Sequence, residues 1–296
     1  MILTTVLQAD TFATPVCDIC VSSDDAYAVV GSGSTAKILN IDLSTPVTAL
    51  SHPSSVSSIS LSRDNTRLCS SSSRFCHYYD VTTASELRRL SSSMSRLSCS
   101  RFFSHRSLLV SGDVAGGVYL YDPRRHASTP IQTFSVSDSV SAISSHQFGH
   151  STFLCGASNG DAYLYDLRNC AVKKDELGAK LLNVSQSPCF YYYSFISNKS
   201  VGIVDCLDGS CLKLIEVDNS KINQRLGLSI IRNGDCLVYS DRSGKVFIYD
   251  LLIDDVIDCV DVENGPVSAI SLCNSNSNEF ILVGSFSGSV YQCDLR

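Results

Sequence analysis

The side chains best suited to chemistry in this sequence are cysteines and histidines, which together bind zinc in many proteins. Cys17 and Cys20 form a lone Cys-x-x-Cys with no second pair. The only histidine cluster is His146 and His150 with Cys155 nearby, in a segment typical of a turn between two strands. A structural zinc site takes four ligands. We therefore predict reduced thiols and a solvated turn with no metal, and keep a structural metal as the lesser alternative.

Serine runs at 70–73 and 91–93 raise the question of a nucleophile. No Gly-x-Ser-x-Gly elbow with a downstream Asp and His accompanies them. The sequence also has no Gly-x-Gly-x-x-Gly or Gly-Lys-Ser loop to hold a phosphate, and Gly31–Gly33 is typical of a hairpin turn. We predict no catalytic residue, no enzymatic activity and no cofactor.

A repeat of about 40 residues provides the elements that must position any site. Short alternating segments end in a large or apolar residue followed by Asp. These closing pairs are Ile41-Asp42, Tyr79-Asp80, Tyr121-Asp122, Tyr165-Asp166, Val204-Asp205, Tyr249-Asp250 and Cys293-Asp294. Successive Asp residues are 38, 42, 44, 39, 45 and 44 positions apart.

Each unit has the same internal order of short strands and polar turns. The third unit shows a strand at 108–111, a turn at 112–117 and a strand at 118–121. In the fourth unit the corresponding turn is Asn159-Gly160. Seven such units with almost no helical periodicity predict an all-β chain, 1–296, folded as a single seven-bladed β-propeller domain.

The two ends of the chain indicate how the ring closes. The first unit begins near Pro15, which leaves residues 2–8 as an extra strand, and the last unit ends at Arg296 after its third strand. We expect the N-terminal strand to complete the last blade and cover both sheet edges.

Unit five fits the repeat least well. Its segment Phe190–Phe195 is unusually aromatic, and Val204-Asp205 is a poor closing pair. The aromatic run is either an adaptation of the core or an exposed patch.

Composition limits the classes of partner. Hydrophobic residues make up 44% and charged residues 18%, and the net charge is −6, so direct binding to nucleic acid is not expected. We find neither a signal peptide nor an apolar run long enough to span a membrane. With its 14 cysteines reduced, the protein is expected to be a soluble monomer in the cytoplasm, with the nucleus as a further location.

The closing pairs resemble those of the WD-repeat family, with Tyr-Asp in place of Trp-Asp in four units. Of the family's usual loop histidines, only His52 is present. Where the family places a turn Asp, this sequence has Thr35, Ser73, Ala115, Asn159, Asn198, Ser243 and Ser287. We therefore expect the family's side-chain hydrogen-bond network to be mostly absent.

A closer resemblance extends along the whole chain to the mitogen-activated protein kinase organizer 1 family of seven-bladed WD-repeat scaffolds. The similar segments are Arg63–Ser70, Glu86–Leu90, Tyr121–Arg125, Pro130–Thr133, Gly160–Arg168, Lys221–Gln224 and Ser243–Leu251. The resemblance implies a scaffold for components of a mitogen-activated kinase cascade. Members of that family also occur in splicing complexes.

The exit loops Asp122-x-Arg124 and Asp166-x-Arg168, with Asp294-x-Arg296 as a third example, contain the candidate partner-binding residues. In WD-repeat proteins such tetrads resemble the docking motif of substrate receptors for cullin-4 ubiquitin ligases. The alternative is structural, because each Arg could pair with the preceding Asp or with a neighbouring blade. An exposed Arg suits an interface because its fork makes bidentate contacts, so we single out Arg124, Arg125 and Arg168.

The leading hypothesis is a non-catalytic scaffold for protein–protein interaction, as the kinase-organizer resemblance implies. The alternatives are an adaptor of a cullin-4 ubiquitin ligase and a structural subunit associated with splicing. In each case the partners are other proteins.

Overall fold

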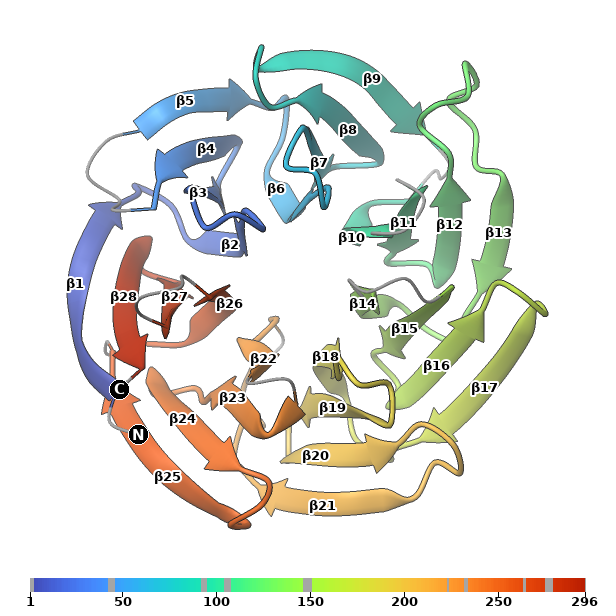
Figure 1. The fold of residues 1–296 in the computed structure, drawn as a ribbon. Helices are drawn as coiled ribbons and strands as arrows, with labels where there is room; N and C mark the ends of the chain where they lie inside the picture. Colours follow the sequence, from blue (N-terminus) through green and yellow to red (C-terminus); the bar gives the residue numbers. More distant parts are fainter. Residues whose placement is uncertain are drawn as a thin grey trace.

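The computed structural model describes residues 3–41, 46–91, 95–103, 108–145, 151–222, 224–231, 234–262, 265–274 and 279–295, without the side chains of 3–11, 46 and 274. Their strands form seven antiparallel sheets of four strands each, arranged as blades around a central axis (Figure 1). The seven-bladed propeller predicted from the repeat is confirmed.

The strands occupy four concentric positions. The inner strands are β2 (Val16–Val21), β6 (Val56–Leu61), β10 (Leu97–Phe103), β14 (Val140–Ser145), β18 (Leu181–Gln186), β22 (Leu228–Ile231) and β26 (Val267–Asn274). The second strands are β3 (Tyr27–Ser32), β7 (Arg67–Ser72), β11 (Leu108–Asp113), β15 (Thr152–Ala157), β19 (Tyr192–Ser197), β23 (Cys236–Ser240) and β27 (Glu279–Ser285).

The third strands are β4 (Thr35–Asn40), β8 (Phe75–Asp80), β12 (Gly117–Tyr121), β16 (Asp161–Asp166), β20 (Ser200–Asp205), β24 (Lys245–Asp250) and β28 (Ser289–Leu295). The outer strands are β5 (Pro46–Ser51), β9 (Ser85–Ser91), β13 (Gln132–Ser135), β17 (Ala171–Glu176), β21 (Cys211–Glu216), β25 (Asp255–Asp261) and β1 (Leu3–Thr11).

The last blade is completed by the N-terminal strand, as predicted. β1 pairs antiparallel with β28 from Leu3 opposite Leu295 to Thr11 opposite Ser289. This sheet has the order β1-β28-β27-β26 and joins the two ends of the ring (Figure 1). The strand is longer than the 2–8 segment expected from the sequence, and it covers the edge that β28 would otherwise expose.

The hydrophobic core is divided into seven clusters, each between two neighbouring blades. The second strands therefore bury both faces. Leu68 of β7 packs toward blade one, whereas its neighbour Cys69 packs toward blade three. Successive side chains of a strand point to opposite faces, so a strand between two blades needs apolar or small residues at every position.

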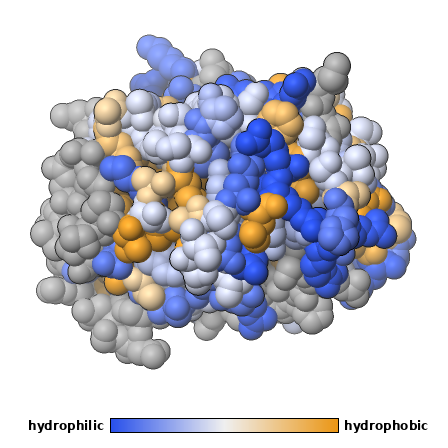
Figure 2. Space-filling view, turned by 90° about the horizontal axis from the view of Figure 1, so that it is seen from above, coloured by the Kyte–Doolittle hydropathy of each residue, from blue (hydrophilic) through white to orange (hydrophobic). Residues whose placement is uncertain are grey.

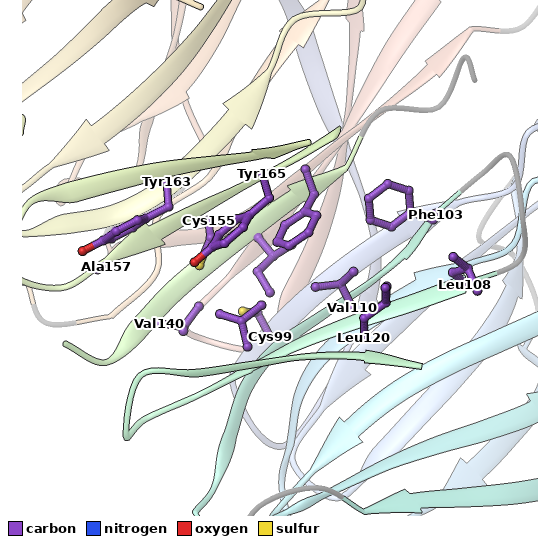
Figure 3. Packing of buried hydrophobic residues seen from close by; sticks show 13 residues of the cluster. Cys99, Phe103, Leu108, Val110, Leu120, Val140, Cys155, Ala157, Tyr163 and Tyr165 are labelled. Carbon is purple, nitrogen blue, oxygen red and sulfur yellow. The ribbon is translucent and has the colours of Figure 1, made fainter. Parts of the chain in front are cut away.

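The repeated closing aromatic residue has a specific packing role. Tyr79, Tyr121 and Tyr165 each lie in the cluster shared with the preceding blade. Figure 3 shows the cluster between blades three and four with Tyr165 labelled. In this cluster Tyr165 stacks on Phe153 with ring centroids 4.6 Å apart. The large residue recurs because it fills the same space between each pair of sheets.

The repeated Asp has a separate role in the exit loop. Its Oδ1 accepts the backbone N–H two residues later: Asp80 from Thr82 at 3.0 Å, Asp122 from Arg124 at 3.1 Å and Asp166 from Arg168 at 2.9 Å. This hydrogen bond forms an Asx turn, which reverses the chain toward the outer strand. Asp42 lies outside the described residues.

Two turns test the strand boundaries. In blade three, β11 continues to Asp113 and β12 begins at Gly117, so the turn is shorter than the predicted 112–117. In blade four, Gly160 has φ of 101°, and a Cβ there would lie 2.9 Å from the backbone of Ala179. Glycine is required at this turn, as the Asn-Gly pair predicts.

Blade five is regular. Its four strands β18 to β21 pair in order, and Val204 is fully buried in the closing position. In the aromatic run, Tyr193 and Phe195 are buried in the core, whereas Tyr191 is 69% exposed. Most of the run is thus an adaptation of the core, with one exposed ring.

Part of the WD-type hydrogen-bond network is present in blade two. His52 Nε2 lies 2.6 Å from Ser70 Oγ, and the Tyr79 hydroxyl lies 3.3 Å from the same nitrogen. Tyr79 thus takes the place that the family gives to tryptophan.

Among the described residues, no helix has the length and hydropathy needed to cross a membrane.

Candidate functional site

The two exit-loop arginines are held by their own loop aspartates. Arg124 donates from Nε to Asp122 Oδ1 at 2.8 Å and from Nη2 to Asp122 Oδ2 at 2.9 Å. Arg168 makes the same fork on Asp166 at 3.0 and 2.7 Å. These ion pairs lower the pKa of Asp122 and raise the pKa of both arginines. Each arginine therefore pairs with the preceding Asp of its own loop, which is the structural role given as the alternative to partner binding.

This pairing leaves the arginines available to a partner. Their side chains are 66% and 64% exposed, and Arg125 beside Arg124 is also exposed. Both loops connect a third strand to an outer strand in adjacent blades, so they lie on the same face of the ring, which we call the exit face. Arg296 lies outside the described residues.

Of the cysteine and histidine candidates, Cys17, Cys20 and Cys155 lie among the described residues. Cys17 donates its thiol to the Gly31 carbonyl at 3.1 Å, and burial raises the pKa of Cys17 to about 12 and that of Cys20 to about 11. His146 and His150 lie outside the described residues, and Cys155 is fully buried. Within the described parts of the chain, no group of three metal-ligating side chains occurs.

A charged cluster at the ring axis was not predicted from the sequence. Asp18 of β2 is 3% exposed and receives Arg101 Nη1 from β10 at 2.8 Å, Ser58 Oγ from β6 at 2.9 Å and the Ile59 backbone N–H at 2.9 Å, all on Oδ2. Blades one, two and three are thus joined through one carboxylate.

A second arginine reaches the same carboxylate from blade six. Arg225 precedes β22, the shortest inner strand described, and its Nη1 lies 3.3 Å from Asp18 Oδ2. Its side chain is 20% exposed. We call Asp18, Arg101 and Arg225 the axial cluster. It has one negative and two positive charges.

Electrostatics in the axial cluster favour the ionised carboxylate. Burial alone would raise the pKa of Asp18, but the two guanidinium groups and the hydrogen bonds outweigh it and lower the pKa to about 2. Burial and the neighbouring Arg101 lower the pKa of Arg225, against the attraction of Asp18. Arg225 is the less well compensated of the two arginines.

Sequence reasoning missed this cluster because its members are far apart in the chain and belong to no repeated motif. The available signal was a charged residue on a strand that is otherwise apolar or small, which holds for Asp18 within Val16–Val21 and for Arg101 within Leu97–Phe103.

Comparison with known proteins supports the fold. No family model matches the chain. An uncharacterized WD repeat-containing protein of Schizosaccharomyces pombe is 26% identical over 163 residues, which cover 54% of this chain and 53% of that protein. WD repeat-containing protein RUP1 of Arabidopsis thaliana is 27% identical over 154 residues, 48% of this chain and 38% of RUP1. The fold is a seven-bladed β-propeller, and the chain is similar to these WD repeat-containing proteins.

These similarities support a general role in protein–protein interaction. The chain spans about half, or less, of the length of the relatives that it matches. WD-repeat propellers in general are platforms for protein–protein interaction rather than enzymes, and this supports an interaction scaffold. The absence of catalysis in this particular chain stays a prediction, as does the role of Arg124, Arg125 and Arg168.

Proposed function

We propose that this protein is a non-catalytic scaffold that binds other proteins through the rim and faces of its propeller. The observation that carries the proposal is an exposed apolar surface on blades five and six. Leu207 and Leu252 are each 82% exposed, Ile253 is 67% exposed and Leu212 is 57% exposed. Together with Tyr191 we call them the five–six patch.

An ion pair joins the two blades at this patch. Lys213, next to Leu212 on β21, places Nζ 2.6 Å from Asp254 in the β24–β25 loop, beside Ile253. Within blade five, the N–H of Cys206 donates to the Tyr191 carbonyl at 2.9 Å, which joins the β20–β21 loop to the backbone of Tyr191. Large exposed apolar side chains that cluster with a few charges mark interaction surfaces.

The surface on the other side of the ring from the patch mixes polar and apolar residues. Figure 2 looks onto the rim at the top of Figure 1, over β5 and β9, where hydrophilic atoms interrupt the hydrophobic ones. β21 and β25, which flank the patch, lie at the opposite rim (Figure 1). The patch and the surface seen in Figure 2 therefore lie on opposite sides of the ring.

A ring of this kind can hold several proteins at once and raise their effective concentration for one another. From the resemblance to the mitogen-activated protein kinase organizer 1 family, we propose components of a mitogen-activated kinase cascade as these partners. We also propose that the chain acts as a monomer in the cytoplasm, with the nucleus as a second location.

Affinity purification with mass spectrometry tests the scaffold. The protein and its Leu207→Asp/Leu252→Asp/Ile253→Asp variant would each be used as bait. Val172→Asp, on the exposed side of β17, is the matched control. We expect kinase-cascade proteins with the unchanged and control baits, and their loss with the triple variant. Splicing proteins in their place would favour the splicing subunit, and the same partners with all three baits would reject the patch.

A second candidate function, an adaptor of a cullin-4 ubiquitin ligase, is favoured by one observation. Arg124 and Arg168 are held in fixed orientation by their aspartates on the exit face, and each remains about two-thirds exposed. Preorganised arginine forks lose less conformational entropy when they bind. The Arg124→Glu/Arg168→Glu variant should lose cullin-4 components. Arg74→Glu/Arg96→Glu, exposed on the opposite face, should keep them. Ligase binding that survives in both variants would reject the adaptor.

A further inference from the structure

The axial cluster has an uncompensated positive charge, and we infer that it is a binding site for one oxyanion, a carboxylate or phosphate group, next to Arg225. The three residues of the cluster come from different sides of the ring and meet near its axis (Figure 1). They lie on β2, on β10 and in the segment before β22. This inference does not depend on the scaffold function.

Asp18 is already satisfied without Arg225. Its Oδ2 receives hydrogen bonds from Arg101, Ser58 and the Ile59 N–H, and its Oδ1 accepts the Ile19 N–H at 3.2 Å. A carboxylate oxygen has two lone pairs, so Oδ2 has no acceptor capacity left for Arg225. The 3.3 Å approach of Arg225 is a charge contact that lacks hydrogen-bond geometry.

Two buried nitrogen atoms of the Arg225 guanidinium make no hydrogen bond. Its Nε and Nη1 are buried and have no hydrogen-bond partner. A buried donor of this kind costs on the order of 1–3 kcal/mol when it is unpaired, and more when it is charged. Among the described residues, Asp18 is the only carboxylate within ion-pair distance of either arginine.

Arg101 shows what a structural arginine looks like in the same place. Its Nη1 also lies 2.7 Å from Ser58 Oγ and 2.8 Å from the Ile59 carbonyl, so this guanidinium ties strands together. Arg225 has no such contacts, and its side chain is one-fifth exposed. A guanidinium with unused donors, on a side chain that is partly exposed and next to an excess positive charge, recognises an oxyanion through paired N–H···O bonds.

The oxyanion has two possible sources. It is either a small free anion or an acidic side chain that a protein partner inserts at the axis. Both offer two or more oxygens in the geometry of a guanidinium fork. The shared chemistry defines the site, and the experiment distinguishes the sources.

The probes are inorganic phosphate and acetate, titrated into the full-length protein after dialysis at fixed ionic strength and followed by calorimetry and by the melting temperature. The variant is Arg225→Met, which keeps the length of the side chain. The control is Arg96→Met, an exposed arginine directly before inner strand β10. Because phosphate stabilises many proteins by exclusion from their surfaces, the readout is the difference between variants.

We expect the unchanged protein and the control to bind phosphate or acetate, and the Arg225→Met variant to bind at least about tenfold more weakly. Without added anion, Arg225→Met should melt at the same or a higher temperature, because it removes a repelled charge. Equal binding by all three proteins, or no binding by the unchanged protein, would overturn the site.

Elution from immobilised protein then separates the sources. If phosphate releases a bound protein from the unchanged chain, and Arg225→Met fails to retain that protein, the natural oxyanion is an acidic side chain. If the bound proteins are the same for both chains while phosphate binding depends on Arg225, the natural oxyanion is a free anion. Either result supports the site, and neither decides whether the five–six patch binds a partner.

Discussion

Nη1 of Arg101, in blade three, lies 2.8 Å from Oδ2 of Asp18, in blade one, and this ion pair joins two blades that are not neighbours. Ser58 of blade two bonds to both residues, at 2.7 Å to Arg101 and 2.9 Å to Asp18. The inner strands of three blades therefore form one polar unit, in addition to the apolar clusters that lie between neighbouring blades. That unit fixes the relative positions of the inner strands at the axis.

Replacement of Asp18 should be strongly destabilising. The Asp18→Asn substitution keeps the shape of the side chain but leaves Arg101 and Arg225 buried without a counter-charge. Loss of one partner of a buried ion pair costs about 3–5 kcal/mol. We expect a reduction of that size in the free energy of unfolding, measured by urea denaturation and far-ultraviolet circular dichroism.

The matched control is Asp122→Asn. Asn retains the ability to form the Asx turn of the exit loop, and the arginine released from its ion pair is already exposed. The change in unfolding free energy should be small because exposed ion pairs contribute little. Similar destabilisation by both variants would show that Asp18 has no special role.

The sequence predicted the ring but not the axial cluster, for a physical reason. A large or apolar residue followed by Asp, as in Tyr121-Asp122, recurs in each unit because every blade needs a filler between sheets and a turn into its outer strand. A repeated requirement is visible in one sequence. Asp18 and Arg101 meet a requirement that occurs once in the ring, and 83 residues separate them.

The exit loops were predicted from the sequence in part. The Asp-x-Arg spacing correctly indicated that Arg124 could pair with Asp122, because an Asx turn brings both side chains to one side. How much of Arg124 stays exposed depends on the packing around the loop, which the spacing does not specify. In blade five, alternation did not separate the buried Tyr193 from the exposed Tyr191, because both have the same parity along the chain.

Stability should fall between neutral pH and pH 5 because of His52. Burial, with the nearby His77, lowers the pKa of His52 to about 4 from an ordinary 6.5. The unfolded chain takes up a proton below pH 6.5 and the folded chain does not. The contribution of neutral His52 to the free energy of unfolding is therefore fully present above pH 6.5 and is lost as the pH falls toward 4. We expect a loss of about 2 kcal/mol at pH 5, from urea midpoints at pH 7 and pH 5.

The His52→Gln variant removes this proton uptake, and its stability should change much less between the two pH values. His126→Gln is the control, because His126 is exposed in the exit loop of blade three. His77 remains in both variants, where burial lowers its pKa against the pull of Glu86, 3.0 Å away. If His52→Gln shows the same pH dependence as the unchanged protein, the assignment to His52 is wrong.

Closure of the ring by β1 should determine whether the propeller melts as one cooperative unit. Removal of residues 1–11 would leave the N–H and C=O groups of β28, from Ser289 to Leu295, as an open sheet edge. We expect the melting temperature to fall by at least about 10 °C, since a few kcal/mol shift the melting temperature of a domain of this size by that amount. We also expect the shortened chain to self-associate through the open edge.

A synthetic peptide of residues 1–14 should pair with β28 and restore the melting temperature. A peptide of the same composition in scrambled order should not, because antiparallel pairing places each side chain in a fixed register. Unchanged melting and solubility of the shortened chain would show that the other blades hold the ring closed without this strand.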